Sequence, residues 1–419
     1  MRNWAGNHAY AAGALHEPRT VEELQEIVRR AAKCRVVGSR HSFNDVADTT
    51  GDLISLATMP HEIEIDGGSR CVTVGGGIRY GELCGPLNEA GLALHSLASL
   101  PHISVAGACA TGTHGSGDRT TNLATAIRSL ELVRADGEIV TLDRQHDPVA
   151  VDAAAVSLGA LGVVTRLTLE TEPAYEMRQD VYEDLSRDAF DRHFDEITAL
   201  ADSVSFFTEW RGPVIDQVWL KRRLLGTDDP ALPGELFGAT PATVDLHPIR
   251  RLPAEACTPQ LGVPGPWHER VPHFRMDHTP SSGDELQTEY FVRRSDAVAA
   301  FRSLDRLRDR IAPLIQVSEI RTIAADGLWL SPAHDRPSVA FHFTWQPDWP
   351  SVRGLLPAIE AALTAFEPRP HWGKLFTIAP ADVRGRYERL SDFVALARRL
   401  DPSGKFSNRF VDRFLFDVI

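Results

Sequence analysis

Two segments in the second half of the chain carry pairs of polar residues that could bind and polarise a hydroxyl compound. Glu319 and Arg321 lie in one predicted strand and His342 and Thr344 in another. Because strand side chains alternate, each pair shares one face. If the two strands are neighbours, the four side chains form a floor of donors and acceptors suited to several hydroxyl groups. A solvated outer face of an antiparallel sheet is the alternative from the residues alone.

A glycine-containing turn near the N-terminus is typical of a phosphate site. A short predicted strand at 35–37 breaks into Gly38-Ser39-Arg40-His41-Ser42. Successive backbone N–H groups in such a turn converge on one point and can bind an anion. His41 would then lie beside whatever carries the phosphate, although a purely structural turn is the commoner reason for such a glycine.

A second segment, 99–117, consists almost entirely of small residues. Small side chains let the backbone approach a flat ring or a pyrophosphate closely, and Ser104, Thr111 and Thr113 add hydroxyl donors. A glycine-rich surface loop explains the composition equally well. The glycines at 75–77 lack the Rossmann spacing, and the sequence contains no Walker or His-Glu-x-x-His motif. Two small-residue loops without a Rossmann turn argue against NAD as the cofactor.

The elements that must position these residues predict an α+β protein with two domains. The chain has 419 residues, and single cores stop growing near ~250–300 residues. Short strands and helices alternate at first, with an N-cap at Thr20, a helix over 79–90 and a hairpin at the Asp-Gly pair 136–137. Longer elements follow, with one helix expected over 296–310 and an ordered proline-rich loop over 224–273.

Composition excludes several classes of protein. The net charge is −13 and the basic residues are scattered, so neither a nucleic-acid partner nor an anionic membrane is expected. Five cysteines without a Cys-x-x-Cys pair argue against a disulfide framework and against a zinc site, and no metal is predicted. No apolar stretch is long enough to span a membrane, and the N-terminus has no apolar signal region, so a cytoplasmic protein is expected.

Several short motifs occur along the chain in the same order as in a known family. They lie at 3–7, 38–44, 74–80, 98–117, 157–165, 263–270, 319–322, 342–345 and 369–374. In these motifs the sequence resembles the vanillyl-alcohol oxidase superfamily of FAD enzymes, and within it the bacterial alditol oxidases. The resemblance implies a two-domain vanillyl-alcohol oxidase-like fold. It comprises an FAD-binding domain over 1–175, a substrate or cap domain with a mostly antiparallel sheet over 176–370, and a segment over 371–419 that returns to the FAD domain.

The resemblance also implies a bound FAD that is covalently attached to His41. Its pyrophosphate would lie against backbone of Val36, Val37, Gly38, Ser39, Arg40, His41 and Ser42. Other residues implied to line the cofactor are Ser99, Ser104, Gly107, Thr111, Gly112, Thr113 and His114, with Val164 near the adenine and His371 near the ring. Arg40 departs from the glycine of the family, and a positive φ there would cost arginine about 1 kcal/mol.

The activity implied is oxidation of the C1 primary alcohol of a linear polyol, such as xylitol or sorbitol, to an aldose with reduction of O₂ to H₂O₂. Arg321 and Lys374 would stabilise developing alkoxide charge, and His342 is the candidate base by residue type. The residues implied to bind the substrate are Ser99, Glu319, Arg321, Thr344 and Lys374. Ala98 is small and would leave O₂ a path. By sequence alone, Lys374 could equally be an ordinary surface lysine.

Two other functions stay open at this point. A sugar-1,4-lactone oxidase of the gulonolactone or arabinonolactone type shares the Gly-Gly-Gly-Ile-Arg-Tyr and His-Trp-Gly-Lys features. A flavin-binding module without turnover would leave the charged residues Glu319, Arg321, His342 and Lys374 unexplained. Beyond a small-molecule substrate and O₂, no partner is predicted, and the protein is expected to be a monomer.

Overall fold

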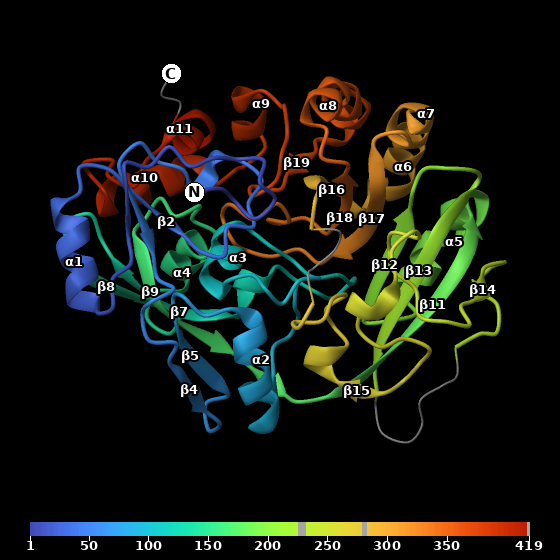
Figure 1. The fold of residues 1–419 in the computed structure, drawn as a ribbon, viewed down its shortest axis with the longest axis horizontal. Coiled ribbons are helices and arrows are strands. Elements are labelled where there is room, and N and C mark those ends of the chain that lie inside the picture. The colour runs from blue at the N-terminus through green and yellow to red at the C-terminus, as the bar shows by residue number, and fades with distance from the viewer. Residues whose placement is uncertain (225–231, 279–282, 417–419) are drawn as a thin grey trace.

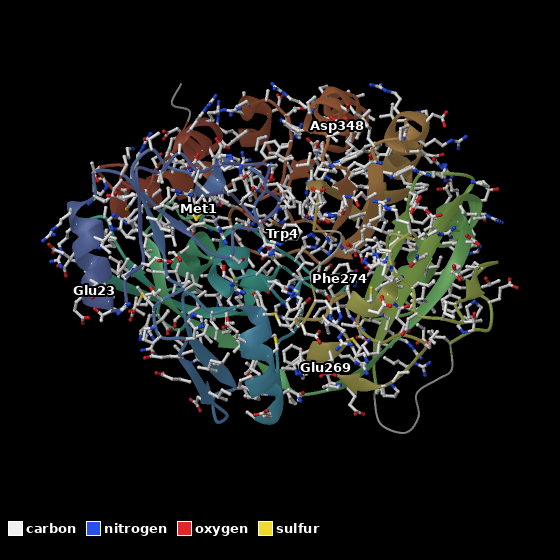
Figure 2. The ribbon with its side chains drawn as sticks, in the orientation of Figure 1. Met1, Trp4, Glu23, Glu269, Phe274 and Asp348 are labelled. Carbon is white, nitrogen blue, oxygen red and sulfur yellow. The ribbon has the colours of Figure 1, made fainter. Side chains whose placement is uncertain are left out.

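Two assemblies of helices and strands lie side by side in the computed structural model, which describes residues 1–224, 232–278 and 283–416 (Figure 1). The blue and blue-green elements of the first third form one assembly, and the yellow-green to orange strands of a large sheet form the other. Trp4 and Phe274, labelled near the middle of Figure 2, lie where the two assemblies meet. Helices combined with a mostly antiparallel sheet confirm the predicted α+β class.

The first assembly is built on a five-stranded antiparallel sheet. Its order is β4 (Ile63–Asp66), β5 (Cys71–Gly75), β9 (Val163–Glu170), β7 (Ile127–Val133) and β8 (Ile139–Asp143). The predicted hairpin is confirmed, because β7 pairs antiparallel with β8 and Gly137 has a φ of 81°. The predicted helix after β5 is α2 (Tyr80–Glu89), and Gly91 follows it with a φ of 74°.

A small parallel sheet positions the glycine turn. Its order is β1 (Ala14–His16), β3 (Asp52–Ser55) and β2 (Cys34–Val37). The helix α1 (Val21–Arg30) precedes β2, and the Thr20 side chain accepts a hydrogen bond from the Glu23 amide at 3.2 Å, as its sequence predicts. Strand β2 ends at Val37, so residues 38–42 leave the sheet from its carboxyl end.

The second assembly is a nine-stranded antiparallel sheet. Its order is β14 (Thr240–Pro241), β11 (Glu176–Ser186), β13 (Val214–Arg223), β12 (Ser203–Thr208), β17 (Ile315–Ile323), β18 (Ser338–Trp345), β16 (Leu286–Arg293) and β19 (Arg369–Pro370), with β15 (Gly265–Pro266) on β11. Every residue of β17 and β18 is buried. That burial excludes the alternative that these two strands expose a solvated face.

Helices cover this sheet, and one of them differs from its prediction. The covering helices are α5 (Arg187–Thr198), α6 (Ala297–Asp305), α7 (Arg308–Ile311) and α8 (Trp349–Leu363). The continuous helix expected over 296–310 is wrong, because the chain breaks between α6 and α7. The Leu307 amide bonds to the Leu304 carbonyl at 2.8 Å, which tightens the last turn of α6 into a 3₁₀ turn.

The remaining elements are short. They are β6 (Leu92–Ala93), α3 (Val105–Ala110), α4 (Pro148–Ala154), β10 (Glu172–Pro173), α9 (Pro380–Arg384), α10 (Leu390–Leu400) and α11 (Arg409–Val411). The proline-rich run 224–273 contains β14, β15 and two single 3₁₀ turns, and its residues 225–231 lie outside the described residues. Among the described residues, no helix is both long and apolar enough to cross a membrane.

The C-terminal segment returns to the first assembly. The Cys34 amide bonds to the Lys405 carbonyl at 3.0 Å, and Arg35 Nη1 donates to the Phe406 carbonyl at 2.7 Å. The Asn408 amide group donates to the Asp48 carbonyl at 2.8 Å. These bonds attach the C-terminal segment to β2 and to the chain that follows it.

The packing of the first assembly can be tested at Gly76, which follows β5. A Cβ added to Gly76 would overlap the backbone carbonyl of Val164, whereas the exposed Gly354 in α8 has open space around it. We expect Gly76→Ala to lower the free energy of unfolding by about 1–3 kcal/mol, because backbone must move. Gly354→Ala should raise it by about 1 kcal/mol through helix propensity. Thermal unfolding of the two variants checks this, and an equal or higher melting temperature for Gly76→Ala would contradict it.

Candidate active site

A cleft of about 290 Å³ lies between the two assemblies. It is lined by 20 of the 21 residues that the sequence analysis assigns to cofactor and substrate: Val36, Val37, Gly38, Ser39, Arg40, His41, Ser42, Ser99, Ser104, Gly107, Thr111, Thr113, His114, Val164, Glu319, Arg321, His342, Thr344, His371 and Lys374. Gly112, which the family resemblance also assigns to the cofactor, is not among the residues that line this cleft. It turns the backbone out of α3 with a φ of 71° and packs near Pro332 and Asn122 instead.

The glycine turn has the strained residue that its sequence suggests. Arg40 has a φ of 63°, in the left-handed region that favours glycine. Its carbonyl accepts a hydrogen bond from the Trp4 amide at 2.8 Å, and its guanidinium donates to the Arg2 carbonyl at 3.3 Å. The N-terminal residues therefore compensate the strained conformation and fix the orientation of the next residue, His41.

His41 has two unsatisfied ring nitrogens. Neither Nδ1 nor Nε2 has a hydrogen-bond partner among the described residues, although both atoms are buried. The Trp4 ring stacks on the imidazole with centroids 5.1 Å apart. Burial lowers the pKa of His41 to about 4, with a further contribution from His102, so the ring is neutral near pH 7. A neutral imidazole with a free lone pair facing a cleft is a suitable nucleophile for a covalent bond.

The two small-residue segments contact each other across the cleft floor. The Ser104 amide donates to Ser39 Oγ at 3.0 Å, at the start of α3. A Cβ on Gly38 would overlap Ser104 Oγ, and one on Gly107 would lie 2.7 Å from the same atom. A side chain at either glycine would have to displace the Ser104 hydroxyl, which lies close to both segments. The cradle therefore fits a group with a pyrophosphate and a flat ring, and the orphaned nitrogens of His41 fit its attachment.

The segment that carries Lys374 is tied directly to the His41 turn. The Phe43 amide bonds to the Gly373 carbonyl at 2.7 Å, and the Asn44 side chain donates to the Lys374 carbonyl at 2.7 Å. The His371 amide bonds in turn to the Glu289 carbonyl at 3.0 Å on β16. The Lys374 side chain is 14% exposed and lines the cleft, so the alternative of an ordinary surface lysine is excluded.

Strand register brings the polar residues of the substrate side together. His342 in β18 is paired with Glu319 in β17 on one side and with Glu289 in β16 on the other. The strands of Glu319 and His342 are therefore neighbours, which is the condition that the sequence analysis set for a shared polar floor. Glu289 was missed by the sequence analysis, although its place two residues after Gln287, with Leu286 and Tyr290 on the other face of the strand, could have indicated it.

Glu289 is the centre of the charged cluster. Its Oε1 accepts from Arg321 Nη2 at 2.8 Å and lies 3.3 Å from His114 Nε2, and its Oε2 accepts from Lys374 Nζ at 2.7 Å. Its side chain has 0% exposure. Burial opposes its ionisation, but Lys374, His114 and Arg321 outweigh burial and hold the pKa of Glu289 well below its usual value. Glu289 is therefore a carboxylate with both oxygens occupied.

Hydrogen bonds fix the tautomer of His342. Lys374 Nζ lies 2.6 Å from His342 Nδ1, and His342 Nε2 lies 3.0 Å from Thr344 Oγ1. An ammonium group has only donors, so Nδ1 accepts and Nε2 carries the proton that is donated to Thr344. Burial, followed by the Lys374 charge, lowers the pKa of His342 to about 4. The ring is neutral near pH 7.

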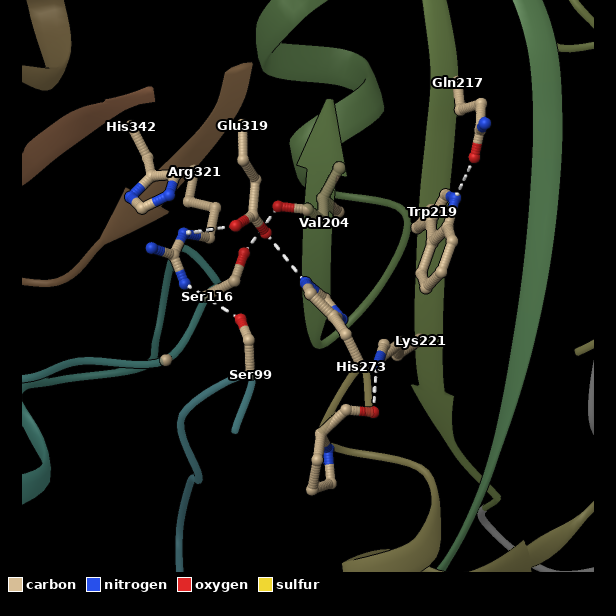
Figure 3. A network of polar contacts seen from close by, with 12 residues as sticks. Ser99, Ser116, Val204, Gln217, Trp219, Lys221, His273, Glu319, Arg321 and His342 are labelled. Atoms are coloured by element: carbon tan, nitrogen blue, oxygen red, sulfur yellow. Dashed lines mark hydrogen bonds and ion pairs between the residues drawn. The ribbon is translucent and has the colours of Figure 1, made fainter. Parts of the chain in front are cut away.

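Glu319 is the second carboxylate of the cluster, and it lies between Arg321 and His273 (Figure 3). Glu319 Oε1 lies 2.8 Å from His273 Nε2, and Glu319 Oε2 lies 3.5 Å from Arg321 Nε. Burial raises the pKa of Glu319, but Arg321 and His273 outweigh burial and hold it below its usual value. Lys221 Nζ donates to three successive carbonyls, of residues 270–272, at 2.8 Å each. The lysine thereby anchors the loop that presents His273.

Ser99 lies at the end of the Arg321 side chain. Its Oγ lies 3.5 Å from Arg321 Nη1, and its carbonyl accepts from the His273 amide at 3.1 Å. His273 and His247 also line the cleft and were both missed by the sequence analysis. Both lie in the run 224–273, where periodicity gives no indication of which side chains face inward.

Comparisons with known proteins agree with the site. A family described as "FAD binding domain" matches residues 12–143, and one described as "D-arabinono-1,4-lactone oxidase" matches residues 284–414. The first match contains the glycine turn and the small-residue segment, and the second contains β16, β17, β18 and Lys374. The fold and the cleft define an FAD-dependent oxidoreductase with a vanillyl-alcohol oxidase-like fold.

Relatives match over nearly the whole chain. The alditol oxidase of a Streptomyces species is 51% identical over 98% of this chain and 98% of its own. The L-gulono-1,4-lactone dehydrogenase of Mycobacterium tuberculosis is 31% identical over 99% of this chain and 98% of its own. The mouse L-gulonolactone oxidase is 24% identical over 99% of this chain. The chain belongs to the alditol oxidase family of the vanillyl-alcohol oxidase superfamily.

Solved structures support the fold. Cholesterol oxidase from Brevibacterium sterolicum matches with a TM-score of 0.78 and 15% identity over 99% of this chain and 96% of that chain. A solvent-stable cholesterol oxidase matches with a TM-score of 0.78 and 16% identity over 99% and 97%. At this identity the likeness concerns the fold alone.

Proposed function

We propose that this protein is a covalent-FAD alditol oxidase that oxidises the C1 primary alcohol of a linear polyol to the aldose and reduces O₂ to H₂O₂. The observation that carries the proposal is one cleft in which a flavin-type cradle meets a cluster of hydroxyl-binding groups. The name of the 51% identical relative supports the same substrate class. FAD, when bound, supplies the hydride acceptor and passes the electrons to O₂.

The cradle residues hold the cofactor in this proposal. His41 makes the covalent bond, and its stacked Trp4 keeps the imidazole plane fixed. Backbone N–H groups of residues 38–42 bind the pyrophosphate, because successive N–H groups form an anion site. Ser104 and Gly107 keep the ring-binding backbone close to the turn.

Arg321 and Lys374 polarise the reacting hydroxyl. Each cation uses part of its donors on Glu289, which leaves Arg321 Nη1 and one Lys374 N–H for the substrate. Donors fixed in advance around a developing alkoxide stabilise it without reorganisation. In the low dielectric of a closed cleft, this stabilisation exceeds its value in water.

His342 remains the proposed proton acceptor, reached through Lys374. Its Nδ1 already accepts from Lys374 Nζ, so Nζ can give one of its protons to Nδ1 as it takes the proton of the substrate hydroxyl, and Lys374 ends as an ammonium again. The low pKa of the resting ring opposes this transfer. Negative charge developing on the substrate oxygen offsets the Lys374 charge and makes the ring a better acceptor. Thr344 then holds the Nε2 proton.

The remaining polar groups select the substrate. Glu319 is held by His273 and Arg321, and it accepts from hydroxyls farther along the polyol chain together with Thr344 and Ser99. A substrate without these hydroxyls would leave buried groups unpaired, which rejects it strongly.

A sugar-1,4-lactone oxidase is the second candidate. The match of residues 284–414 to the D-arabinono-1,4-lactone oxidase family favours it. The lactone-named relatives are less similar to this chain, at 31% identity or below over comparable lengths. A lactone is a ring without a C1 primary alcohol, so the two candidates need different substrates.

The test is anaerobic mixing of the purified holoenzyme with xylitol, sorbitol or L-gulono-1,4-lactone. We expect both polyols to bleach the flavin absorbance, and readmitted air to restore it with formation of H₂O₂. Bleaching by the lactone alone would establish the second candidate. A flavin that none of the three bleaches would refute both candidates.

We further propose the division of the chain that the family implies. An FAD-binding domain over 1–175 is supported by the five-stranded sheet, whose last strand ends at Glu170. A substrate domain over 176–370 is supported by the nine-stranded sheet, and a returning segment over 371–419 by the bonds of residues 405–408 to the first assembly. We propose that the protein acts as a monomer.

A further inference from the structure

We propose that Glu289 is a positioning residue: its carboxylate sets the separation of Arg321 and Lys374 and keeps Lys374 protonated. The inference rests on the proposed function for its catalytic meaning, since the two cations act there on the substrate hydroxyl. The geometry that carries it is independent of any substrate. Both carboxylate oxygens are engaged, each with a different cation.

The contacts of Glu289 distinguish it from the substrate-binding residues. Its side chain has 0% exposure, whereas those of Glu319, Arg321 and Lys374 have 7%, 7% and 14%. Arg321 binds Oε1, Lys374 binds Oε2 and His114 Nε2 lies 3.3 Å from Oε1, so both carboxylate oxygens are held by side chains of the protein. Glu289 therefore acts through the two cations and not on the substrate.

The rigid carboxylate works as a spacer. Its two oxygens are a fixed distance apart, so the nitrogens bonded to them, Arg321 Nη2 and Lys374 Nζ, are held at a fixed separation. Glu289 itself is fixed by the ladder, because β16 pairs with β18 over eight residues. The separation of the cations is thus set by sheet register and not by two long, flexible side chains.

The charge of Glu289 is as important as its shape. Two buried cations on neighbouring elements repel each other, and burial alone lowers the pKa of Lys374 below its usual value. Glu289 opposes that shift, while Arg321 adds to it. The other charged or titratable groups facing Lys374 are Glu319, His342, His114 and His371, of which only Glu319 is anionic, and it is engaged by Arg321 and His273.

The activity is expected to depend on pH through the protonation of Lys374. Lys374 stabilises an alkoxide only as the ammonium, so activity is lost as pH rises through the pKa of Lys374. Removing the negative charge of Glu289 lowers that pKa further. In Glu289→Gln, activity should therefore be lost at a lower pH than in the wild type, and remain closest to the wild type on the acid side.

The experiment measures first the protonation of Lys374 and then the rate of flavin reduction. Trace labelling of the holoenzyme with acetic anhydride, which reacts with neutral amines, is followed across pH by mass spectrometry of the Lys374 peptide. Anaerobic flavin reduction by xylitol is measured over the same pH range. The variants are Glu289→Gln, Glu289→Asp as the charge-retaining rescue, and Glu360→Gln as a matched control. Glu360 is also a buried carboxylate, which accepts from the Tyr290 hydroxyl on the other face of β16.

We expect the labelling midpoint of Lys374 to move to lower pH in Glu289→Gln and to return toward the wild type in Glu289→Asp. Flavin reduction should fall about 10²–10³-fold in Glu289→Gln at alkaline pH, and by less at acid pH, with flavin content unchanged. Glu360→Gln should keep the wild-type midpoint. An unmoved midpoint in Glu289→Gln, or an equal loss of rate at every pH, would overturn the proposal. A wild type that xylitol fails to reduce would refute the proposed function, while the labelling result would still decide the role of Glu289.

Discussion

Replacing Lys374 by methionine is expected to lower the rate of flavin reduction by a polyol by about 10²–10³-fold, equivalent to about 3–4 kcal/mol of transition-state stabilisation. Methionine keeps much of the volume and removes the ammonium that lies 2.7 Å from Glu289 and 2.6 Å from His342. The developing alkoxide then loses one of its two fixed cationic donors, and His342 loses its link to the substrate proton.

The measurement is stopped-flow reduction at saturating xylitol, which separates the chemical step from binding. The loss should appear mainly in the limiting rate and less in the apparent Kd, because the donor acts most strongly on the transition state. Lys33→Met is the control, since Lys33 is exposed and its ammonium group donates to the backbone carbonyl of Gly404. A Lys374→Met enzyme with a wild-type limiting rate would remove this lysine from the mechanism.

Replacing His41 by alanine is expected to abolish the flavin fluorescence that stays with the denatured chain. In the wild type this fluorescence should migrate with the polypeptide, because the proposed bond survives denaturation. The prediction rests on two buried ring nitrogens that lack partners in the described residues and on the neutral state of the ring. The variant replaces only the side chain of residue 41 and keeps the backbone of 38–42 and the residues 104–107, so FAD should still bind reversibly.

The control is His102→Ala. His102 is close enough to influence the charge state of His41, but its Nε2 lies 3.0 Å from the Met276 carbonyl. It should retain the covalent flavin. Fluorescence is read on a denaturing gel, and flavin released by acid is measured in the supernatant. Wild-type flavin that appears wholly in the supernatant would exclude the covalent bond.

Local pattern was sufficient for the features that depend on neighbours along the chain. The shared face of Glu319 and Arg321, and that of His342 and Thr344, follow from the two-residue period of a strand. The hairpin at Gly137 and the N-cap at Thr20 follow from turn and cap chemistry. Arg40 stands where the family has glycine, and the structure finds it at a φ of 63°.

The position of Glu289 beside His342 could not be predicted from local sequence pattern. The sequence places it on a strand, but not beside His342, because β16 and β18 are separated by β17 and two helices along the chain. Strand order is decided by which faces can be buried together over the whole fold.

By itself, the sequence determined the α+β class, the two small-residue loops and the polar faces of two strands, because these depend on residues a few positions apart. The tertiary structure alone decided that these parts meet in one cleft, that Lys374 is buried there, and that Glu289 lies between the two cations. Those facts depend on pairing between β16, β17 and β18 and on the bonds of the Lys374 segment to the His41 turn. Such long-range pairing is set by the burial of whole faces, which no local spacing records.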